Sequence, residues 1–403
     1  MRSVLSKIKF IVSNKNIIFV KSLSEVDAII YFDNDVELLK KWILSPIGLK
    51  STIVRNPFQL IINFKVIIFF IKNIKLIIGK NFIRRAWFTY EKSLIKVYNP
   101  KIVITTIDNA NFVSELSKID KGRSYFAIQN GARFDYDVKN IRKSVFKEID
   151  KKSFIYFIWS EYEKTVFTKH SDYKCHFISV GSLRQSISEH YPTKLVELNN
   201  KKFDICMASS VFGLRNYDIP RAVYGEKVVD DEWNIMNAII AKYLKRYIKE
   251  KNKSLIVVLR GQRDYEINMY ESIFSGTKNV FLMPRGFPAS NTNAYFNTYA
   301  AVKKSEVIVS MASSVTLEAL NYGKKILQVD YSLGKQYFTN YVDGLWQLTE
   351  NTYEAFSNRL NQILQLDINE YNNNIKEYKN HVMKIDSVEP TYLKIQKEIN
   401  KII

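Results

Sequence analysis

The stretch from Ser305 to Tyr331 has the residue types and the spacing that could hold an anionic ligand. It reads SEVIVSMASSVTLEALNYGKKILQVDY, a pattern that predicts a strand, a hydroxyl-rich turn and then a helix. The first N–H groups of a helix have no partner within the helix and carry partial positive charge. Hydroxyl groups of Ser313, Ser314 and Thr316 at such a helix start would therefore suit a phosphate or a carboxylate.

Glu318 follows one turn into the same predicted helix, where its carboxylate could accept hydrogen bonds from ribose hydroxyls. An ordinary capped helix accounts for the same residues. Ser313 or Ser314 would then be the N-cap, and Glu318 would only favour the positive end of the helix. The motif alone leaves both interpretations open.

Four more polar clusters follow predicted strands elsewhere in the chain. They are Asp108 to Asn111, Gln129 to Arg133, Ser209 with Ser210, and Arg260 to Arg263. In open parallel sheets, ligands bind outside the carboxyl ends of the strands. Because all five clusters stand at such ends, we expect them to converge on one site.

Strands and helices alternate along the chain, which predicts an α/β fold with parallel sheets covered on both faces. The polar segment 181–200, with Pro192 and an Asn-Asn-Lys-Lys cluster, separates two such alternations. We expect a GT-B-like arrangement of two doubly wound, Rossmann-like domains facing each other across a cleft. Their expected limits are 1–190 and 203–375, with a C-terminal helical segment at 376–403.

Length and composition agree with two folded domains, since the chain has 403 residues, of which 46% are hydrophobic and 14% aromatic. Sixty Lys and Arg against 40 Asp and Glu give a net charge of +20, which favours anionic partners. The basic residues are scattered, and no zinc spacing or helix-turn-helix pattern accompanies them. Nucleic acid is therefore not an expected partner.

Cysteine and histidine usage predicts a reducing compartment and no metal centre. Cys175 and Cys206 are the only cysteines, and the four histidines lack ligand spacing. Charged residues interrupt the first twenty positions, so no export signal is expected. We predict a cytoplasmic protein.

The most hydrophobic segment, Leu60 to Ile78, is interrupted by Lys65, Lys72 and Lys75. Its uncharged runs are too short to span a bilayer. It could form a basic amphipathic surface that lies on anionic lipid, at the inner face of the cell membrane. The alternative is a pair of core helices whose lysine side chains extend to the solvent.

The order of the motifs resembles that of GT-B glycosyltransferases of bacterial surface-carbohydrate biosynthesis. The motifs are IDNANF, FAIQNGAR, VGSLR, LRGQRDYE and SSVTLEAL. Within this group they are similar to lipopolysaccharide and capsule transferases that use CMP-activated Kdo and other nonulosonic acids. The S-S-x-T-x-E-A-L-x-x-G pattern also occurs in GT-B enzymes that use UDP-sugars or CDP-glycerol, so the donor stays open.

The resemblance implies transfer of a sugar from a nucleotide donor to a glycan or glycolipid acceptor. The donor-binding residues that it implies are Ser209, Ser210, Ser313, Ser314 and Thr316, with Glu318 on the ribose. Many relatives carry a His-Pro pair after the strand that here leads into Arg260. Since this chain lacks that pair, charge at the phosphate would come from Arg260 or Arg263.

On the acceptor side, an inverting transfer needs a base within reach of the acceptor hydroxyl. Asp108 is the candidate, although it could instead be the N-cap of the next helix. Gln129, Asn130 and Arg133 could orient the acceptor. A retaining mechanism, which would need a carboxylate nucleophile, also stays open.

No carboxylates form a persuasive metal pair in the sequence, so we expect neither a metal nor another cofactor. Fixed N–H donors and an arginine can stabilise a departing phosphate without one. Two other functions remain on this sequence: a polyol-phosphate transferase of the CDP-glycerol type, and a non-catalytic scaffold that binds a glycan or nucleotide. The net positive charge would also help to hold a lipid-diphosphate acceptor.

Overall fold

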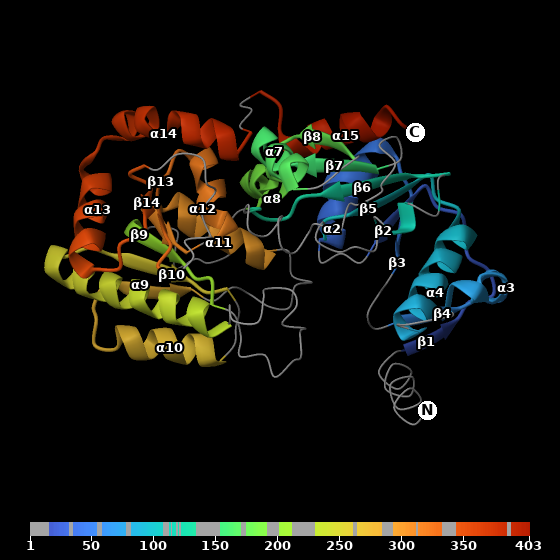
Figure 1. The fold of residues 1–403 in the computed structure, drawn as a ribbon, viewed down its shortest axis with the longest axis horizontal. Helices are drawn as coiled ribbons and strands as arrows, with labels where there is room; N and C mark the ends of the chain where they lie inside the picture. The colour runs from blue at the N-terminus through green and yellow to red at the C-terminus, as the bar shows by residue number, and fades with distance from the viewer. Residues whose placement is uncertain are drawn as a thin grey trace.

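Parallel pairing organises the chain into two six-stranded sheets and a separate two-stranded one. The computed structural model describes residues 16–31, 35–54, 59–77, 82–107, 113, 115–117, 120, 122–133, 154–170, 175–191, 201–211, 230–260, 264–283, 293–311, 313–332, 344–384 and 388–403. Figure 1 shows the two large sheets side by side with helices around each.

The first sheet has the order β3 (Ser51–Val54), β2 (Ala28–Tyr31), β5 (Ile102–Thr105), β6 (Ser124–Ile128), β7 (Phe154–Ile158) and β8 (His176–Ser179). The helices of this part are α2 (Val36–Leu39), η1 (Lys40–Leu44), η2 (Ser45–Ile47), α3 (Phe64–Lys72), η3 (Ile74–Ile77), α4 (Phe82–Tyr98), α7 (Glu161–His170), α8 (Leu183–Ile187) and η4 (Ser188–His190). The small sheet pairs β1 (Asn16–Phe19) with β4 (Gln59–Ile62). Together with α15, these elements are called the first unit.

The second sheet has the order β11 (Val280–Met283), β10 (Leu255–Val258), β9 (Phe203–Ala208), β12 (Ser305–Ser310), β13 (Lys325–Val329) and β14 (Gln347–Leu348). Its helices are α9 (Asp230–Lys251), α10 (Asp264–Phe274), α11 (Asn293–Lys303), α12 (Ser314–Ala319), η7 (Leu320–Tyr322), α13 (Tyr353–Gln365) and α14 (Ile368–Val382). These elements are called the second unit. The last helix, α15 (Thr391–Asn400), lies beside the first sheet (Figure 1).

The strands are apolar on both faces because both faces are covered by helices. In β2, Ile29 and Tyr31 belong to one core cluster, whereas Ala28 and Ile30 belong to another on the opposite face. Helices α4 and α7 contribute to the first cluster, and α2, α8 and α15 contribute to the second. The predicted α/β class, with two Rossmann-like parallel sheets, is confirmed.

The strand order shows where each sheet has its topological switch point, which is the place where successive strands are added in opposite directions on either side. In the second sheet, β9 lies between β10 and β12, so the reversal falls between β9 and β12. In the first sheet, it falls between β2 and β5. The carboxyl ends of the strands at such a switch point form the crevice where doubly wound proteins bind ligands.

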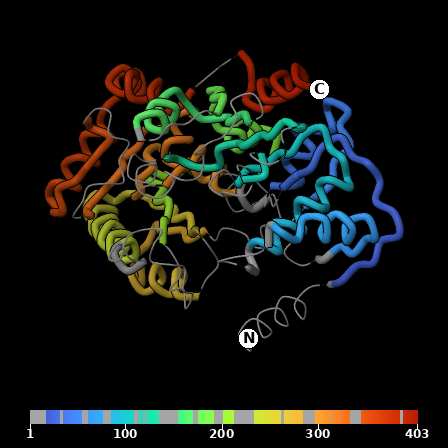
Figure 2. Tube along the Cα trace, turned by 45° about the vertical axis from the view of Figure 1, so that its right-hand side comes forward, coloured from blue at the N-terminus to red at the C-terminus, as the bar shows by residue number. Residues whose placement is uncertain are grey.

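The two units are joined by apolar contacts as well as by the chain. From α11 of the second unit, Phe296 and Tyr299 pack into a core cluster of the first unit. The ring of Phe296 stacks on Tyr191, with centroids 4.1 Å apart. Figure 2 shows the C-terminal end of the chain beside the first unit, after the chain has passed around the second unit.

Several elements differ from the sequence-based expectation. The polar segment after Val180, taken there as a linker, begins with helix α8, because Ser182 caps it and Leu183 and Ile187 are buried on one side. The segment at 60–78 starts as strand β4 and is not a pair of core helices, since Val66 is the buried residue of α3. The last fifty residues form three helices, the first of which ends at Gln365, before Asp367 caps the second.

Helix α15 supplies a direct test of how the C-terminus is held. Ile395 and Ile399 are fully buried against the first unit, and Gln396 donates to the carbonyl oxygen of Trp42 at 2.8 Å. We expect Ile395→Ala to lower the free energy of unfolding by about 2 to 4 kcal/mol. Leu393→Ala, at an exposed position of the same helix, should change it by less than about 1 kcal/mol. Equal effects of the two substitutions in denaturant titrations would show that α15 is not docked in this way.

Candidate functional site

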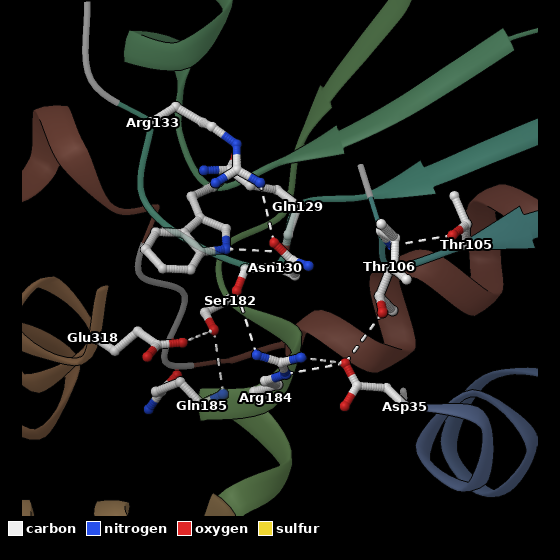
Figure 3. A network of polar contacts seen from close by, with 12 residues as sticks. Asp35, Thr105, Thr106, Gln129, Asn130, Arg133, Ser182, Arg184, Gln185 and Glu318 are labelled. Carbon is white, nitrogen blue, oxygen red and sulfur yellow. Dashed lines mark hydrogen bonds and ion pairs between the residues drawn. The ribbon is translucent and has the colours of Figure 1, made fainter. Parts of the chain in front are cut away.

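The carboxyl edge of the first sheet holds a network of polar side chains (Figure 3). At the switch point, Asp35 is buried and accepts hydrogen bonds through Oδ2 from Arg184, with Nε at 3.0 Å and NH2 at 2.5 Å. Thr106, the residue after β5, also donates to this oxygen, at 3.1 Å. A buried carboxylate held by an arginine in this way joins the ends of β2, β5 and β8.

Gln129 follows β6 and is fully engaged within the protein. Its Nε2 donates to the carbonyl of Gly131 at 2.9 Å and to Glu163 at 3.0 Å, while its Oε1 accepts from the backbone N–H of Trp159 at 2.8 Å. Because every hydrogen-bonding group of the buried amide is used, Gln129 is suited to fixing the loop that follows it. Its predicted contact with an acceptor stays a prediction.

Asn130 and Arg133 lie on that loop. Arg133 is buried, and it donates to the carbonyl of Ala132 at 2.9 Å and to Oδ1 of Asn130 at 3.1 Å. The carbonyl oxygen of Asn130 faces Arg184, 3.5 Å from its NH1. Two guanidinium groups thus meet around one loop at the edge of the sheet, and guanidinium groups are well suited to binding carboxylates and phosphates.

Glu163 supports this loop from helix α7. Its Oε2 accepts from the backbone N–H of Ser160 at 3.0 Å and from the Ser160 hydroxyl at 2.7 Å. Burial raises the pKa of Glu163 to about 6, against the lowering effect of the hydrogen bonds from Gln129 and Ser160. The S-x-x-E spacing of Ser160 and Glu163 is a capping box.

In the second sheet, a buried glutamate holds the loops at the strand ends in the same way. Glu266, buried on α10, accepts the hydroxyl of Ser209 at 2.6 Å and the backbone N–H of Arg260 at 2.9 Å. In each unit, therefore, a buried glutamate ties together the loops after two neighbouring strands. Ser210 donates to the carbonyl of Met311 at 2.5 Å, which connects β9 to β12 across the switch point.

The predicted donor residues Ser313, Ser314 and Thr316 begin helix α12, next to Ser209 and Ser210. Ser313 is the N-cap by its backbone, but its hydroxyl makes no capping hydrogen bond. The Thr316 hydroxyl is buried against that of Ser310. The hydroxyl of Ser314 accepts the backbone N–H of Ala132, from the first unit, at 2.9 Å.

Glu318 also connects the two units. Its carboxylate is buried and accepts a hydrogen bond from Ser182, at the start of α8 (Figure 3). Burial raises the pKa of Tyr299 well above its ordinary value, and the negative charge of the nearby Glu318 raises it further. The role of Glu318 as a ribose ligand stays a prediction.

The structure thus brings described residues from four of the five predicted clusters, all but Asp108 to Asn111, to one junction. Ala132 and Ser314 join the loops after β6 and β12, and Ser182 and Glu318 join the loop after β8 to α12. Arg260 lies at the carboxyl end of β10, and its NH1 contacts the carbonyl of Ser210 at 3.3 Å. Asp108 and Arg263 lie outside the described residues, so their predicted roles are untested.

Sequence reasoning missed four residues of this network: Asp35, Glu163, Ser182 and Arg184. Asp35 and Ser182 stand shortly after strands that were expected from the sequence, so the strand-end rule could have found both. Glu163 could have been found from its capping box with Ser160. Ser182 and Arg184 lie within the VGSLR motif, but nothing in that motif indicates the partner of Arg184, since Asp35 is 149 residues away.

Within the described part of the chain, no group of three His, Cys, Asp or Glu side chains is placed to hold a metal ion. The carboxylates near the junction, Asp35, Glu163 and Glu318, each accept hydrogen bonds from an arginine, an amide or a hydroxyl of the protein. Independence of metals stays a prediction.

Comparison with known proteins gives the family. A model of the family described as "putative O-antigen biosynthesis protein" matches residues 126–399, which includes most of the junction. The chain belongs to this family. No curated protein sequence matches it.

Solved structures share the fold at low sequence identity. The chain is similar to S. aureus MnaA with UDP, with a TM-score of 0.54, 13% identity, and coverage of 93% of this chain and 97% of that one. A UDP-N-acetylglucosamine 2-epimerase has a TM-score of 0.52 and 13% identity, with coverage of 94% of this chain and 96% of that one. The wall teichoic acid polymerase TagF, soaked with CDPG, has a TM-score of 0.51 and 12% identity, with coverage of 93% of this chain and 89% of that one.

These comparisons confirm the GT-B-like fold and a place in surface-carbohydrate biosynthesis. At such identities, the shared structure establishes the fold and leaves the chemistry to the residues of the site. The expected likeness to transferases that use CMP-activated Kdo is not among these findings.

Glu163 gives stability a pH dependence of definite sign. The folded chain holds this proton more tightly than the unfolded chain, so its stabilising effect is complete below the ordinary pKa of 4.5 and is lost as the pH rises through about 6. The loss amounts to about 2 kcal/mol. We expect Glu163→Gln to remove this decline, and Glu271→Gln, at an exposed position of α10, to keep it.

Denaturant titrations between about pH 4 and pH 7 measure the difference between each variant and the parent. A difference for Glu163→Gln that does not change across this range would contradict the assignment of the raised pKa.

Gly131 tests the contact between the units. A Cβ atom at this position would stand 2.9 Å from the hydroxyl oxygen of Ser314. We expect Gly131→Ala to destabilise the protein by about 1 to 3 kcal/mol. Ser314→Ala alone should cost about 1 kcal/mol, because the N–H of Ala132 loses its acceptor.

The double variant lacks the hydroxyl with which the new methyl group at position 131 would clash. Its loss of stability should therefore be smaller than the sum of the losses of the two single variants. Strict additivity in a double-mutant cycle would mean that residues 131 and 314 do not touch in solution.

Proposed function

We propose that the protein is a metal-independent GT-B glycosyltransferase that moves a sugar from a nucleotide donor to a growing surface glycan or glycolipid. The proposal is carried by one observation: Ser209, Ser210, Ser313 and Ser314 gather at the switch point of the second sheet. This is where doubly wound sheets hold nucleotides. Membership of an O-antigen biosynthesis family supports a glycan product.

On the donor side, negative charge develops on the leaving phosphate as the glycosidic bond breaks. Fixed N–H groups at the start of α12, together with Ser313, Ser314 and Arg260, would stabilise that charge without reorganising. Thr316 and Glu318 would support the helix start and the ribose. Arg263 would add a second positive charge.

On the acceptor side, Asp108 would take the proton of the attacking hydroxyl. Asn130 and Arg133 would orient the acceptor, with Gln129 holding their loop. The ion pair of buried Asp35 with partly exposed Arg184 would keep the ends of β2 and β8 in register with this loop. The acceptor and donor would then meet where Ala132 contacts Ser314.

The donor identity is the finer part of the proposal. The motif resemblance favours CMP-activated nonulosonic acids such as Kdo. The solved structures with UDP and with CDPG make a UDP-sugar and a CDP-linked polyol the other donors to compare. We place the reaction at the cytoplasmic face of the membrane, where nucleotide donors are available.

Similarity to TagF favours a second candidate, a polyol-phosphate transferase of the CDP-glycerol type. Such a transferase would form a phosphodiester bond instead of a glycosidic bond. The carboxyl ends of the described strands carry arginine and serine and no histidine, which favours the glycosyltransferase. Analysis of the product linkage separates the two.

Nucleotide binding provides the first test. We expect CMP, UDP or a sugar derivative of one of them to raise the melting temperature at millimolar concentration, because a ligand that binds only the folded state stabilises it. Arg260→Gln should weaken this stabilisation about tenfold in apparent Kd. Arg246→Gln, an exposed arginine on α9, is the matched control and should leave it unchanged.

Turnover with the stabilising donor and a glycan acceptor is the second measurement. Asp108→Asn should retain nucleotide binding and lose at least about 100-fold in kcat. No stabilisation by any nucleotide would contradict the proposal. Binding without turnover in the parent protein would favour the scaffold.

A further inference from the structure

The small sheet and helix α3 present apolar side chains to solvent. Among the side chains of α3 and η3 that the structure describes, the exposed apolar ones are Phe64, Ile67, Ile71 and Ile74. Phe64 has 74% of its surface accessible. The spacing of three and four residues places Phe64, Ile67 and Ile71 on one face of α3. Helix α3 thus has an apolar face that points outward, the reverse of a normal surface helix.

Basic residues border this apolar face. Lys65, Lys72 and Lys75 are all exposed. The sequence has no Asp or Glu from position 38 to position 90, and it has ten Lys and Arg in that span. We call the apolar residues Phe64, Ile67, Ile71 and Ile74, with the three lysines beside them, the α3 face.

The α3 face is held in position by hydrogen bonds from its inner side. Asn63 caps α3 and donates to the carbonyl of Val20 on the β1 side at 2.8 Å. The Tyr90 hydroxyl on α4 bonds to both the N–H and the carbonyl of Ile61, at 2.7 and 2.9 Å. Outward exposure is therefore built into the fold around α3.

We propose that the α3 face docks the protein onto the surface of an anionic lipid bilayer. An apolar stripe flanked by lysines matches the acyl and head-group layers of such a surface. The neighbouring β1 adds a further exposed aromatic side chain, Phe19, with 79% of its surface accessible. Among the residues that the structure describes, no helix is long and apolar enough to span the bilayer, so the contact is at the surface.

Lipid is favoured over a second copy of the chain by charge. A symmetric contact between two α3 faces would bring the same three lysines from each copy together, in a protein with a net charge of +20. An anionic bilayer neutralises those charges instead. Figures 1 and 2 show α3 and β1 at the side of the first unit that faces away from the second unit, so docking leaves the junction between the units clear.

Sedimentation with lipid vesicles tests the proposal without nucleotide, so its outcome is independent of the proposed reaction. The parent protein should bind vesicles of phosphatidylcholine mixed with phosphatidylglycerol, bind phosphatidylcholine alone weakly, and be released by salt. Ile67→Glu with Ile71→Glu should abolish binding. Ile235→Glu with Ile368→Glu, at exposed apolar positions of α9 and α14, should leave it intact.

The contribution of the three lysines is tested with a triple variant of the α3 face and a matched control triple variant. Glutamine at the three lysines of the α3 face should weaken binding on the order of 100-fold at low salt. The matched control makes the same charge change at three exposed lysines of α9: Lys242→Gln, Lys249→Gln and Lys251→Gln. Equal weakening by the control would mean that net charge alone, without the α3 face, attracts the protein to lipid.

Absence of binding to phosphatidylglycerol vesicles by the parent protein would overturn the proposal. So would an α3 variant that converts a dimer to a monomer in sedimentation equilibrium while vesicle binding is unchanged, because the face would then cover a second copy. Unchanged melting temperatures of the variants establish that the substitutions leave the fold intact.

Discussion

The hydrogen bond from the N–H of Ala132 to the hydroxyl of Ser314 fixes where the two sheets meet. Parallel strands end at a common edge, so each sheet collects its polar loops on one side. This bond, with that between Ser182 and Glu318, places the loop-bearing edge of one sheet against that of the other. The rest of the architecture, from the helices on both faces to the return of α15 to the first unit, keeps the two edges opposed.

Buried glutamates carry out the positioning inside each unit. Glu163 binds the backbone after β7 and the side chain of Gln129 after β6. Glu266 binds the backbone after β10 and the side chain of Ser209 after β9. A buried carboxylate is costly unless its oxygens are satisfied. Since each accepts hydrogen bonds from two neighbouring strand ends, the loops are locked to the sheet and can present their remaining groups to a ligand with little reorganisation.

The sequence was sufficient for the α/β class and for most strands, because strands such as β7, β10 and β11 are continuous apolar runs. It was also sufficient for the strand-end clusters. It failed where the partner is distant in the chain: nothing in the local pattern indicates that Arg184 reaches Asp35 or that Ser182 reaches Glu318. It failed also at α3, where amphipathic spacing predicts a helix but cannot tell whether the apolar face points inward or outward.

The central claim is that a nucleotide lies at the switch point of the second sheet, between the ends of β9 and β12. Amide hydrogen exchange with and without saturating CMP or UDP tests it most directly. The account predicts slower exchange in peptides that cover Ser209 to Val211 and Ser313 to Glu318, with no change in α3. Protection confined to the first unit, or none with either nucleotide or their sugar derivatives, would contradict it.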